Sequence, residues 1–234
     1  MARLTTFARS RTKAVPADPW QLLAGHYDRQ AWLERSAVRA ALNMADPRPL
    51  DRLLDLGTGT GMVLRELAKR PGRPDVVVGI DASTAMLARV PALPSGWTVH
   101  HGDALDLPFP ASDFDIVVAS YVLHVLPDAV LAAALSQLTR VLRPSGRLVT
   151  VTPIVPPRGL MRPVATACNA AARSAPSRLG GLRAFDPRPA LEHAGFTPIS
   201  SRVILRGYPS LCVLAHGPAL TPARAAGAVS PAAP

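Results

Sequence analysis

A short apolar run leads directly into a glycine-rich turn at residues 53–62, in the order Leu-Leu-Asp-Leu-Gly-Thr-Gly-Thr-Gly-Met. The apolar run is typical of a buried strand, and the residues from Met62 onward have helical spacing. Because glycine lacks a Cβ, such a turn lets the polar end of a ligand approach backbone N–H groups at the start of the helix. In open α/β sheets, ligands bind beyond the carboxyl ends of the strands, where this turn lies. The segment therefore predicts an α/β fold with a ligand site at the turn.

Short apolar runs and helical patterns continue to alternate along the chain. We expect strands at 53–56, 76–80, 97–100, 114–120 and 147–152, and helices at 18–45, 62–69, 83–90, 128–142 and 188–194. Strands that alternate with helices predict a mostly parallel sheet with helices on both faces. Two more apolar runs, at 197–205 and 211–215, flank Gly207-Tyr208-Pro209-Ser210 and predict an antiparallel hairpin.

The acids around the turn indicate which ligand it would hold. A nicotinamide fingerprint needs a third glycine at position 62, where the chain has Met62, so a nicotinamide oxidoreductase is disfavoured. Asp55 would repel a pyrophosphate, but it suits a ligand that carries an ammonium and a sulfonium. Asp81 ends the next strand about 20 residues past Gly61, which places its carboxylate to accept both hydroxyls of a ribose.

Five blocks of residues, taken in order, resemble the class I S-adenosylmethionine-dependent methyltransferases over residues 50–152. The blocks are 54–61, 78–87, 102–104, 109–117 and 142–148. They are most similar to the small-molecule branch that includes enzymes of ubiquinone and menaquinone biosynthesis. The resemblance implies an enzyme that uses S-adenosyl-L-methionine. It also implies a Rossmann-like, seven-stranded, mostly parallel sheet with a C-terminal antiparallel hairpin and helices on both faces.

The resemblance also implies a set of cofactor contacts. The positions are Asp55, Gly57, Thr58, Gly59, Gly61, Asp81, Ala82, Met86, Asp103, Ala104 and Ser120. The turn at 57–61 is expected to cradle the methionine part of the cofactor, and Asp55 to hold its ammonium directly or through water. Alternatively, Gly57 and Gly59 only tighten the turn.

The remaining contacts would surround the nucleoside and the sulfonium. Asp81 is expected to grip the ribose, with Ala82 and Met86 against the adenine, and Ser120 to line the sulfonium pocket. Asp103 would accept a hydrogen bond from the adenine amino group, next to the backbone N–H of Ala104. Alternatively, Asp103 is only a turn residue and Met86 only part of the core.

Methyl transfer asks little of the protein beyond orientation, because the sulfonium is already activated. A base helps only when the nucleophile arrives protonated. His124 is the candidate base and Tyr121 a candidate pocket residue, since both follow the fourth strand. The alternatives are a histidine bonded to backbone and an aromatic that only packs. His100 and His101 point to opposite faces of a strand, no other cluster has metal-ligand spacing, and we expect no metal.

The formal net charge of +10 lies mostly in two segments that contain no acid, residues 1–17 and 153–185. The rest is nearly neutral, and Ala-Ser-Tyr-Val at 119–122 stands where base-modifying members of the fold usually carry Asn/Asp-Pro-Pro-aromatic. We therefore expect a small-molecule acceptor, anionic, quinone-like or lipid-like, and no nucleic acid. The arginines of the insert would bind an anionic acceptor or a phospholipid-like surface, or form a solvated face.

We expect one methyltransferase domain at 18–215, between a disordered basic arm at 1–17 and a disordered Ala/Pro tail at 216–234. Within the domain we distinguish a helical lid at 18–49, a cofactor-binding core at 50–152, an acceptor-side insert at 153–187, and a C-terminal helix and hairpin at 188–215.

The longest apolar stretch, 116–126, is too short to span a bilayer, and the chain start lacks an apolar signal region. We therefore expect a cytoplasmic protein, with peripheral membrane contact and oligomeric state left open. The basic start also resembles a transit peptide. The alternatives to an enzyme acting on small molecules are a non-catalytic cofactor-binding or scaffold protein and an RNA methyltransferase.

Overall fold

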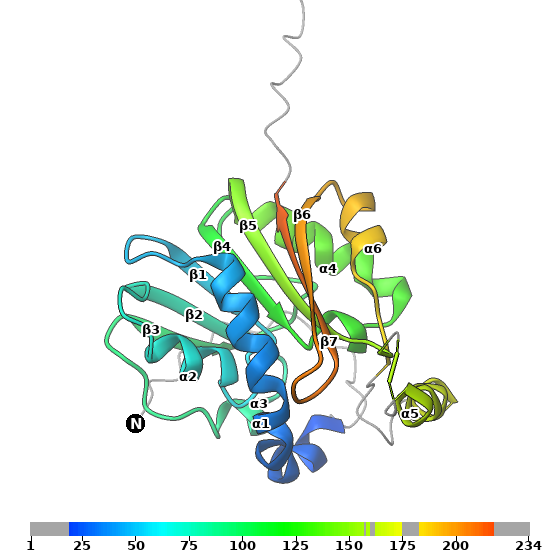
Figure 1. Ribbon diagram of the computed structural model, residues 1–234. Helices are drawn as coiled ribbons and strands as arrows, with labels where there is room; N and C mark the ends of the chain where they lie inside the picture. The colour runs from blue at the N-terminus through cyan, green and yellow to red at the C-terminus, as the bar shows by residue number, and fades with distance from the viewer. Residues whose placement is uncertain (1–18, 157, 160–161, 175–182, 218–234) are drawn as a thin grey trace, which may run out of the picture.

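Seven strands form one sheet in the order β3-β2-β1-β4-β5-β7-β6 (Figure 1). The computed structural model describes residues 19–156, 158–159, 162–174 and 183–217. The strands are β1 (Arg52–Leu56), β2 (Val76–Asp81), β3 (Trp97–His101), β4 (Phe114–Ser120), β5 (Leu142–Pro153), β6 (Thr197–Ile204) and β7 (Ser210–His216). The first five strands pair in parallel, and β7 runs antiparallel to both β5 and β6. The predicted Rossmann-like sheet with its terminal hairpin is confirmed.

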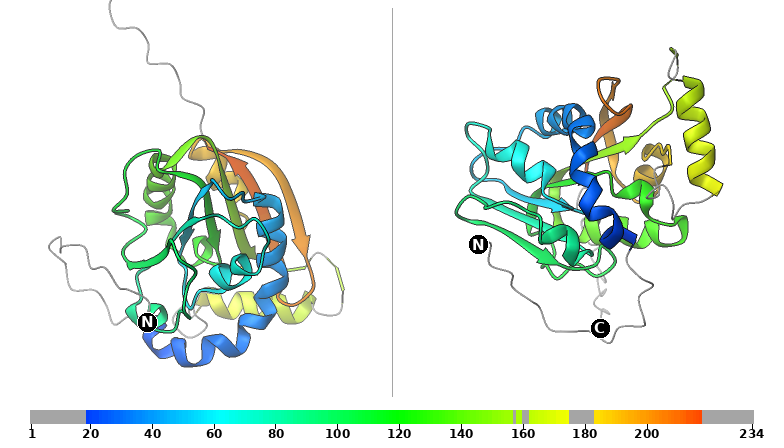
Figure 2. Two further views of the ribbon diagram at one scale, coloured as in Figure 1. Left: turned by 90° about the vertical axis from the view of Figure 1, so that its left-hand side faces the viewer. Right: turned by 90° about the horizontal axis from the view of Figure 1, so that it is seen from below.

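Helices cover both faces of this sheet. They are α1 (Pro19–Ala45), α2 (Met62–Ala68), α3 (Thr84–Leu87), α4 (Asp128–Val141), α5 (Arg162–Ser174) and α6 (Arg188–His193), with a short 3₁₀ turn, η1 (Leu123–Val125). The helices α1, α2 and α3 lie on one face, and α4 and α6 on the other (Figures 1 and 2). Helix α5 stands at the periphery (Figure 2).

The central strands are buried on both faces, so successive side chains enter different cores. Leu53 belongs to the core under α1 and α2, whereas Leu54 belongs to the core under α4. Parallel strands covered by helices on both sides read as continuous apolar runs, which explains why 53–56 and 114–120 were recognisable in the sequence.

Two elements have bounds that differ clearly from the sequence expectation. The helix expected at 83–90 ends at Leu87, because the backbone beyond it tightens into turns that precede Pro91, and a proline disfavours helical backbone in the residue before it. Strand β5 begins at Leu142 rather than 147, with a register shift in its pairing to β4.

The C-terminal boundary also differs. Strand β7 includes His216, so His216 belongs to the sheet and not to the tail, and the N–H of Gly217 after it donates to the carbonyl oxygen of Gly146 at 2.9 Å. The expected arm at 1–17 and the rest of the tail, 218–234, lie outside the described residues.

The second half of α1 is part of the core. Ala37, Val38, Ala41 and Leu42 are buried there against the sheet. The buried carboxylate of Glu66 on α2 joins α1 to α2, since it accepts hydrogen bonds from Arg39 and from Lys69. Burial alone would raise the pKa of Glu66, but these cationic partners outweigh it and hold the pKa below its usual value.

Within the described ranges, no helix has both the length and the apolar composition needed to cross a bilayer.

Candidate active site

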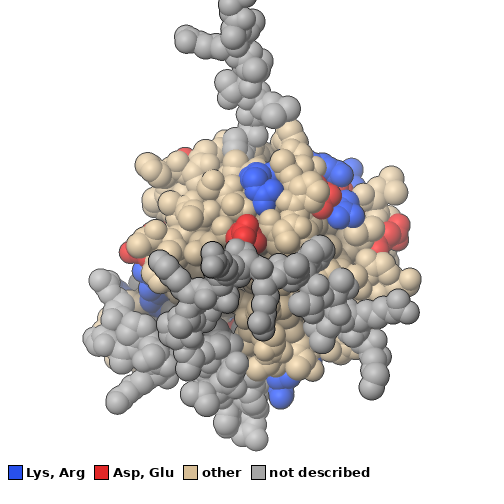
Figure 3. Space-filling view, turned by 180° about the vertical axis from the view of Figure 1, so that it is seen from behind, with Lys and Arg blue, Asp and Glu red and all other residues tan. Residues whose placement is uncertain are grey.

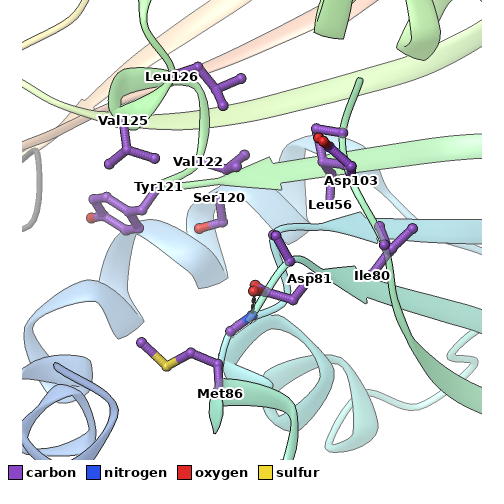
Figure 4. A pocket seen from close by; sticks show the side chains of 15 residues that line it. Leu56, Ile80, Asp81, Met86, Asp103, Ser120, Tyr121, Val122, Val125 and Leu126 are labelled. Atoms are coloured by element: carbon purple, nitrogen blue, oxygen red, sulfur yellow. Dashed lines mark hydrogen bonds between the residues drawn. The ribbon is translucent and has the colours of Figure 1, made fainter. Parts of the chain in front are cut away.

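A pocket opens at the carboxyl ends of β1, β2 and β4, where the sequence predicts the cofactor (Figure 4). Its walls come from the ends of these strands, from α3, and from the loops at 102–104 and 120–126. Most of the predicted cofactor residues line this pocket: Gly57, Gly59, Asp81, Ala82, Met86, Asp103, Ala104 and Ser120. Asp55, Thr58 and Gly61 do not line it.

The glycine turn is held against β2 by its backbone. The N–H groups of Gly57 and Thr58 both donate to the carbonyl oxygen of Ile80, at 2.8 and 3.0 Å. Gly59 has a positive φ of 53°, and a Cβ built on it would meet no described atom within 4 Å. A side chain at position 59 would therefore project into open space at a residue that lines the pocket, so this glycine leaves room for a ligand against the backbone.

Asp81 connects the turn to the end of β2. One carboxylate oxygen accepts a hydrogen bond from the N–H of Gly59 and the other from the N–H of Ser83, both at 2.8 Å (Figure 4). A carboxylate oxygen has further acceptor capacity beyond one bond. Asp81 therefore stands in a fixed orientation at the pocket wall and remains able to accept from ligand hydroxyls.

Asp55 lies beneath the turn and does not line the pocket. Its side chain is fully buried, one oxygen accepts from Oγ1 of Thr58 at 2.6 Å, and the other has no partner among the described residues. Burial raises the pKa of Asp55 to about 7; the hydrogen bond from Thr58 opposes this rise and the nearby charge of Asp81 adds to it.

Thr58 and Gly61 likewise support the turn instead of lining the pocket. Thr58 is buried with its hydroxyl on Asp55. Gly61 precedes α2 in the left-handed conformation, at φ 83°, and faces the side chain of Val90. Both residues therefore support the conformation of the turn without lining the pocket.

Two polar side chains of the pocket differ in how they are bonded. Oδ1 of Asp103 accepts from the N–H of Leu105 at 2.9 Å, so Asp103 closes a turn and lines the pocket at the same time. Oγ of Ser120 is buried and has no partner among the described residues. Because buried hydroxyls are nearly always hydrogen-bonded, Ser120 fits a pocket completed by a polar ligand.

The surroundings of Tyr121 and His124, the two candidate catalytic residues, differ from those that the sequence predicts. Tyr121 lines the pocket, but its hydroxyl lies 2.5 Å from Oγ of Ser210, and burial raises the pKa of the phenol above its usual value. His124 is only 3% exposed and lies outside the pocket lining. Burial, assisted by the charge of Arg183, lowers the pKa of His124 to about 3. His124 is therefore a neutral, enclosed group, and the geometry gives no support to its role as a base.

A second cavity, of about 520 Å³, lies beside the first at the same edge of the sheet. Its walls are the chain after β5, α5, the turn at 205–209 between β6 and β7, and Leu33 of α1. The polar side chains in its lining are those of Arg158, Asn169 and Tyr208. The rings of Tyr121 and Tyr208 pack edge to face with centroids 6.4 Å apart, so this aromatic pair separates the two cavities.

Tyr208 and Leu33 were not singled out in the sequence. They come together because the N–H of Tyr208 donates to the carbonyl oxygen of Leu33 at 2.9 Å, a contact between segments far apart along the chain. Over the described ranges, no group of three His, Cys, Asp or Glu side chains is placed to hold a metal ion.

Comparison with known proteins shows what this chain is similar to. A family model described as a methyltransferase domain matches residues 53–146. Nocamycin O-methyltransferase of Saccharothrix syringae is 39% identical over 141 residues, which cover 58% of this chain and 50% of that protein. The 2-phytyl-1,4-naphtoquinone methyltransferase of Synechococcus elongatus is 40% identical over 121 residues, covering 49% of this chain and 51% of that protein.

The chain thus spans about half the length of these curated relatives. A chain of the solved complex between the Haloferax volcanii Trm112 methyltransferase activator and a methyltransferase shares the fold, with a TM-score of 0.68 and 18% identity. That match covers 87% of this chain and 100% of the other. Residues 53–146 thus match a methyltransferase domain, and the described chain has the fold of a solved methyltransferase.

Proposed function

We propose that the protein transfers a methyl group from S-adenosylmethionine to a small, largely apolar acceptor, quinone-like or lipid-like, by in-line displacement. The observation that carries this proposal is the pair of adjoining cavities with Tyr121 between them. The first cavity has the glycine turn and the carboxylates of a nucleoside site. The volume of the second lies within the range of about 300–1,000 Å³ that is typical of sites for small molecules.

The residues of the first cavity fit the cofactor. Asp81 would accept from its ribose hydroxyls, and the backbone around Gly59 would lie against its methionine part. Ser120 would contribute its hydroxyl, which lacks a partner among the described residues. When bound, the cofactor supplies a methyl group already activated by the sulfonium. The chain's own contribution is then to orient the acceptor and exclude water, and orientation alone is worth about 7–11 kcal/mol in favourable systems.

The lining of the second cavity also favours a particular protonation state of the acceptor. Its described polar side chains, Arg158, Asn169 and Tyr208, include no carboxylate and no histidine that would take a proton. The acceptor would therefore enter as a ready nucleophile, such as the anion of a phenol or hydroquinone. The charge of Arg158 favours the anionic form, because an opposite charge nearby stabilises it.

An acceptor of this kind also agrees with the charge distribution. On the coloured part of the face in Figure 3, basic and acidic side chains are interspersed. The curated relatives named above are an O-methyltransferase and a naphthoquinone methyltransferase by name, which supports a small-molecule acceptor here.

Calorimetric titration with S-adenosylmethionine tests the first half of the proposal. We expect binding by the full chain, weakened roughly ten- to a hundredfold by Asp81→Asn, since a hydrogen bond to a charged group contributes about 1.5–3 kcal/mol. Asp75→Asn is the matched control, because Asp75 is exposed and outside the pocket. Equal affinity in wild type and Asp81→Asn, with both folded, would refute the assigned cofactor site.

Transfer of a labelled methyl group tests the second half. The wild-type chain would be incubated with labelled cofactor and either a reduced naphthoquinone with an alkyl chain or transfer RNA. We expect label in the hydroquinone only, and more of it at higher pH, as the hydroquinone ionises. Label in the RNA alone would overturn the acceptor class, and cofactor binding without any transfer would favour the non-catalytic alternative.

A further inference from the structure

Helix α5 packs little against the rest of the described structure. Every side chain that the structure describes on it is exposed or half-buried, and none is buried. Figure 2 shows it at the periphery, apart from the sheet. A helix of 13 residues is marginal in water, and in proteins helices of this length are stabilised mainly by packing an apolar face. Something else is therefore expected to cover α5.

The described apolar side chains of α5 are largely exposed. Its polar side contacts the protein, since Oδ1 of Asn169 accepts from the N–H of Ala184 at 2.7 Å. On the opposite side of the helix, Val164 is 52% exposed and Ala167 and Ala171 are also exposed. A soluble surface helix normally has the reverse orientation, with its apolar stripe toward the core.

Val164 lies at the second cavity, which another exposed apolar side chain also lines. Val164 and Leu205 both line that cavity, yet Leu205 is 57% exposed. Both residues therefore mark a place where the cavity reaches the surface. Two large apolar side chains at a cavity mouth form a surface that favours an apolar environment.

Cationic side chains stand in the segments that form this part of the surface. Arg158, Arg162 and Arg206 are exposed: Arg158 lines the cavity, Arg162 begins α5, and Arg206 follows Leu205 in the chain. The two segments that carry them, 153–174 and 197–217, contain no Asp or Glu. An apolar patch surrounded by arginines without acids is complementary to a surface that is anionic outside and apolar inside.

We propose that Arg158, Arg162, Val164, Leu205 and Arg206, the docking surface, bind an anionic phospholipid bilayer. Val164 and Leu205 enter the boundary between headgroups and acyl chains, and the three arginines pair with lipid phosphates. The second cavity then opens toward the membrane. This part of the inference rests on the proposed function: a lipid-soluble acceptor would reach the cavity from the bilayer without crossing water.

Vesicle co-sedimentation of the full chain tests the docking surface. We expect binding to vesicles of phosphatidylcholine with phosphatidylglycerol, little binding to pure phosphatidylcholine, and loss of binding at high salt. Replacing Arg158, Arg162 and Arg206 together by Gln should weaken binding roughly a hundredfold, since each basic residue at an anionic surface contributes about fivefold. Val164→Ser with Leu205→Ser should weaken binding to the same vesicles as well.

The matched controls lie elsewhere on the molecule. One control replaces Arg48, Arg70 and Arg73 together by Gln, which removes the same amount of positive charge. The other control, Leu50→Ser, removes an apolar side chain that is 92% exposed. All variants keep the basic residues of 1–17, so a difference between them reports on the docking surface. Equal weakening by the control triple, or no binding of wild type to the anionic vesicles at low salt, would overturn the proposal.

A second copy of this chain is the other conceivable occupant. It would appear as a dimer in sedimentation without lipid that the Val164→Ser, Leu205→Ser variant dissociates, and that result would also overturn the proposal. Titration of each variant with S-adenosylmethionine is a separate measurement, because none of these residues lines the first cavity. Lost vesicle binding with retained cofactor affinity therefore separates the docking surface from the proposed function.

Discussion

The phenol oxygen of Tyr121 lies 2.5 Å from Oγ of Ser210, although 89 positions separate the two residues. Oγ of Ser210 itself donates to the carbonyl oxygen of Tyr208 at 2.7 Å. A hydroxyl has one proton, so Ser210 accepts from Tyr121. This chain of two hydrogen bonds connects the end of β4, which lines the cofactor cavity, to the turn that lines the second cavity.

Replacing Tyr121 by Phe should destabilise the fold by about 1 kcal/mol, because it removes one buried hydrogen bond and keeps the ring. Ser210→Ala should cost more, since it removes both bonds. The double variant should show coupling of about 0.5–1.5 kcal/mol in urea unfolding, as expected for two partners in contact. Strictly additive effects would show that the bond between Tyr121 and Ser210 contributes nothing to the wall between the cavities.

Gly59→Ala should affect cofactor binding far more than folding. The new methyl group would enter open space at the pocket, so the fold should lose only the cost of a positive φ, roughly 1 kcal/mol. Gly72→Ala is the matched control, because Gly72 has φ 66° and its Cβ would come no closer than 3.9 Å to Pro49. The two variants should unfold at similar denaturant concentrations, whereas only Gly59→Ala should bind S-adenosylmethionine more weakly in calorimetry. Equal affinity in both would place the cofactor elsewhere.

Asp55 should make the stability of the protein fall as pH rises from about 4 to 7. Its pKa is raised from 3.8 to about 7 in the folded state, so the folded protein holds a proton that the unfolded chain releases in this window. The stabilisation is complete below pH 4 and lost above pH 7. Asp55→Asn keeps the shape and removes the titration. Urea unfolding at several pH values should show wild type losing stability relative to Asp55→Asn across this window, and parallel curves would contradict the raised pKa.

Most of the fold and much of the candidate site could be predicted from local sequence patterns. The turn at 57–61 and the position of Asp81 depend on residues close in sequence, so strand period, glycine spacing and strand-end position predicted them. The number of strands came with the family resemblance, whereas the order of the strands was not predicted. Boundaries were less certain, as the early end of α3 shows, because they depend on competition between neighbouring turns.

Local sequence patterns could not predict which way individual side chains point. Whether Asp55 enters the pocket or lies under the turn depends on the hydroxyl of Thr58 and on the packing of the turn against β2. The wall formed by Tyr121, Ser210 and Tyr208 needs the pairing of β5 with β7, which joins residues far apart in the chain. The exposed apolar side of α5 could be suspected from its amphipathic pattern, but which side faces the protein required the contact between Asn169 and Ala184.

His124→Leu distinguishes an enclosed histidine from a catalytic base. The pKa of His124 is lowered from 6.5 to about 3 in the folded state. As pH falls, the unfolded chain therefore binds a proton at this histidine before the folded protein does. Wild type consequently loses stability as pH falls from about 6.5 toward 3. Leucine does not titrate, so wild type should lose stability relative to His124→Leu over this range in urea unfolding. Asp55 is present in both proteins, and its opposite pH dependence cancels in the difference.

A base would contribute about 10²–10⁴-fold to methyl transfer. We expect transfer within about threefold of wild type, and a hundredfold loss with unchanged cofactor affinity would restore His124 as the base.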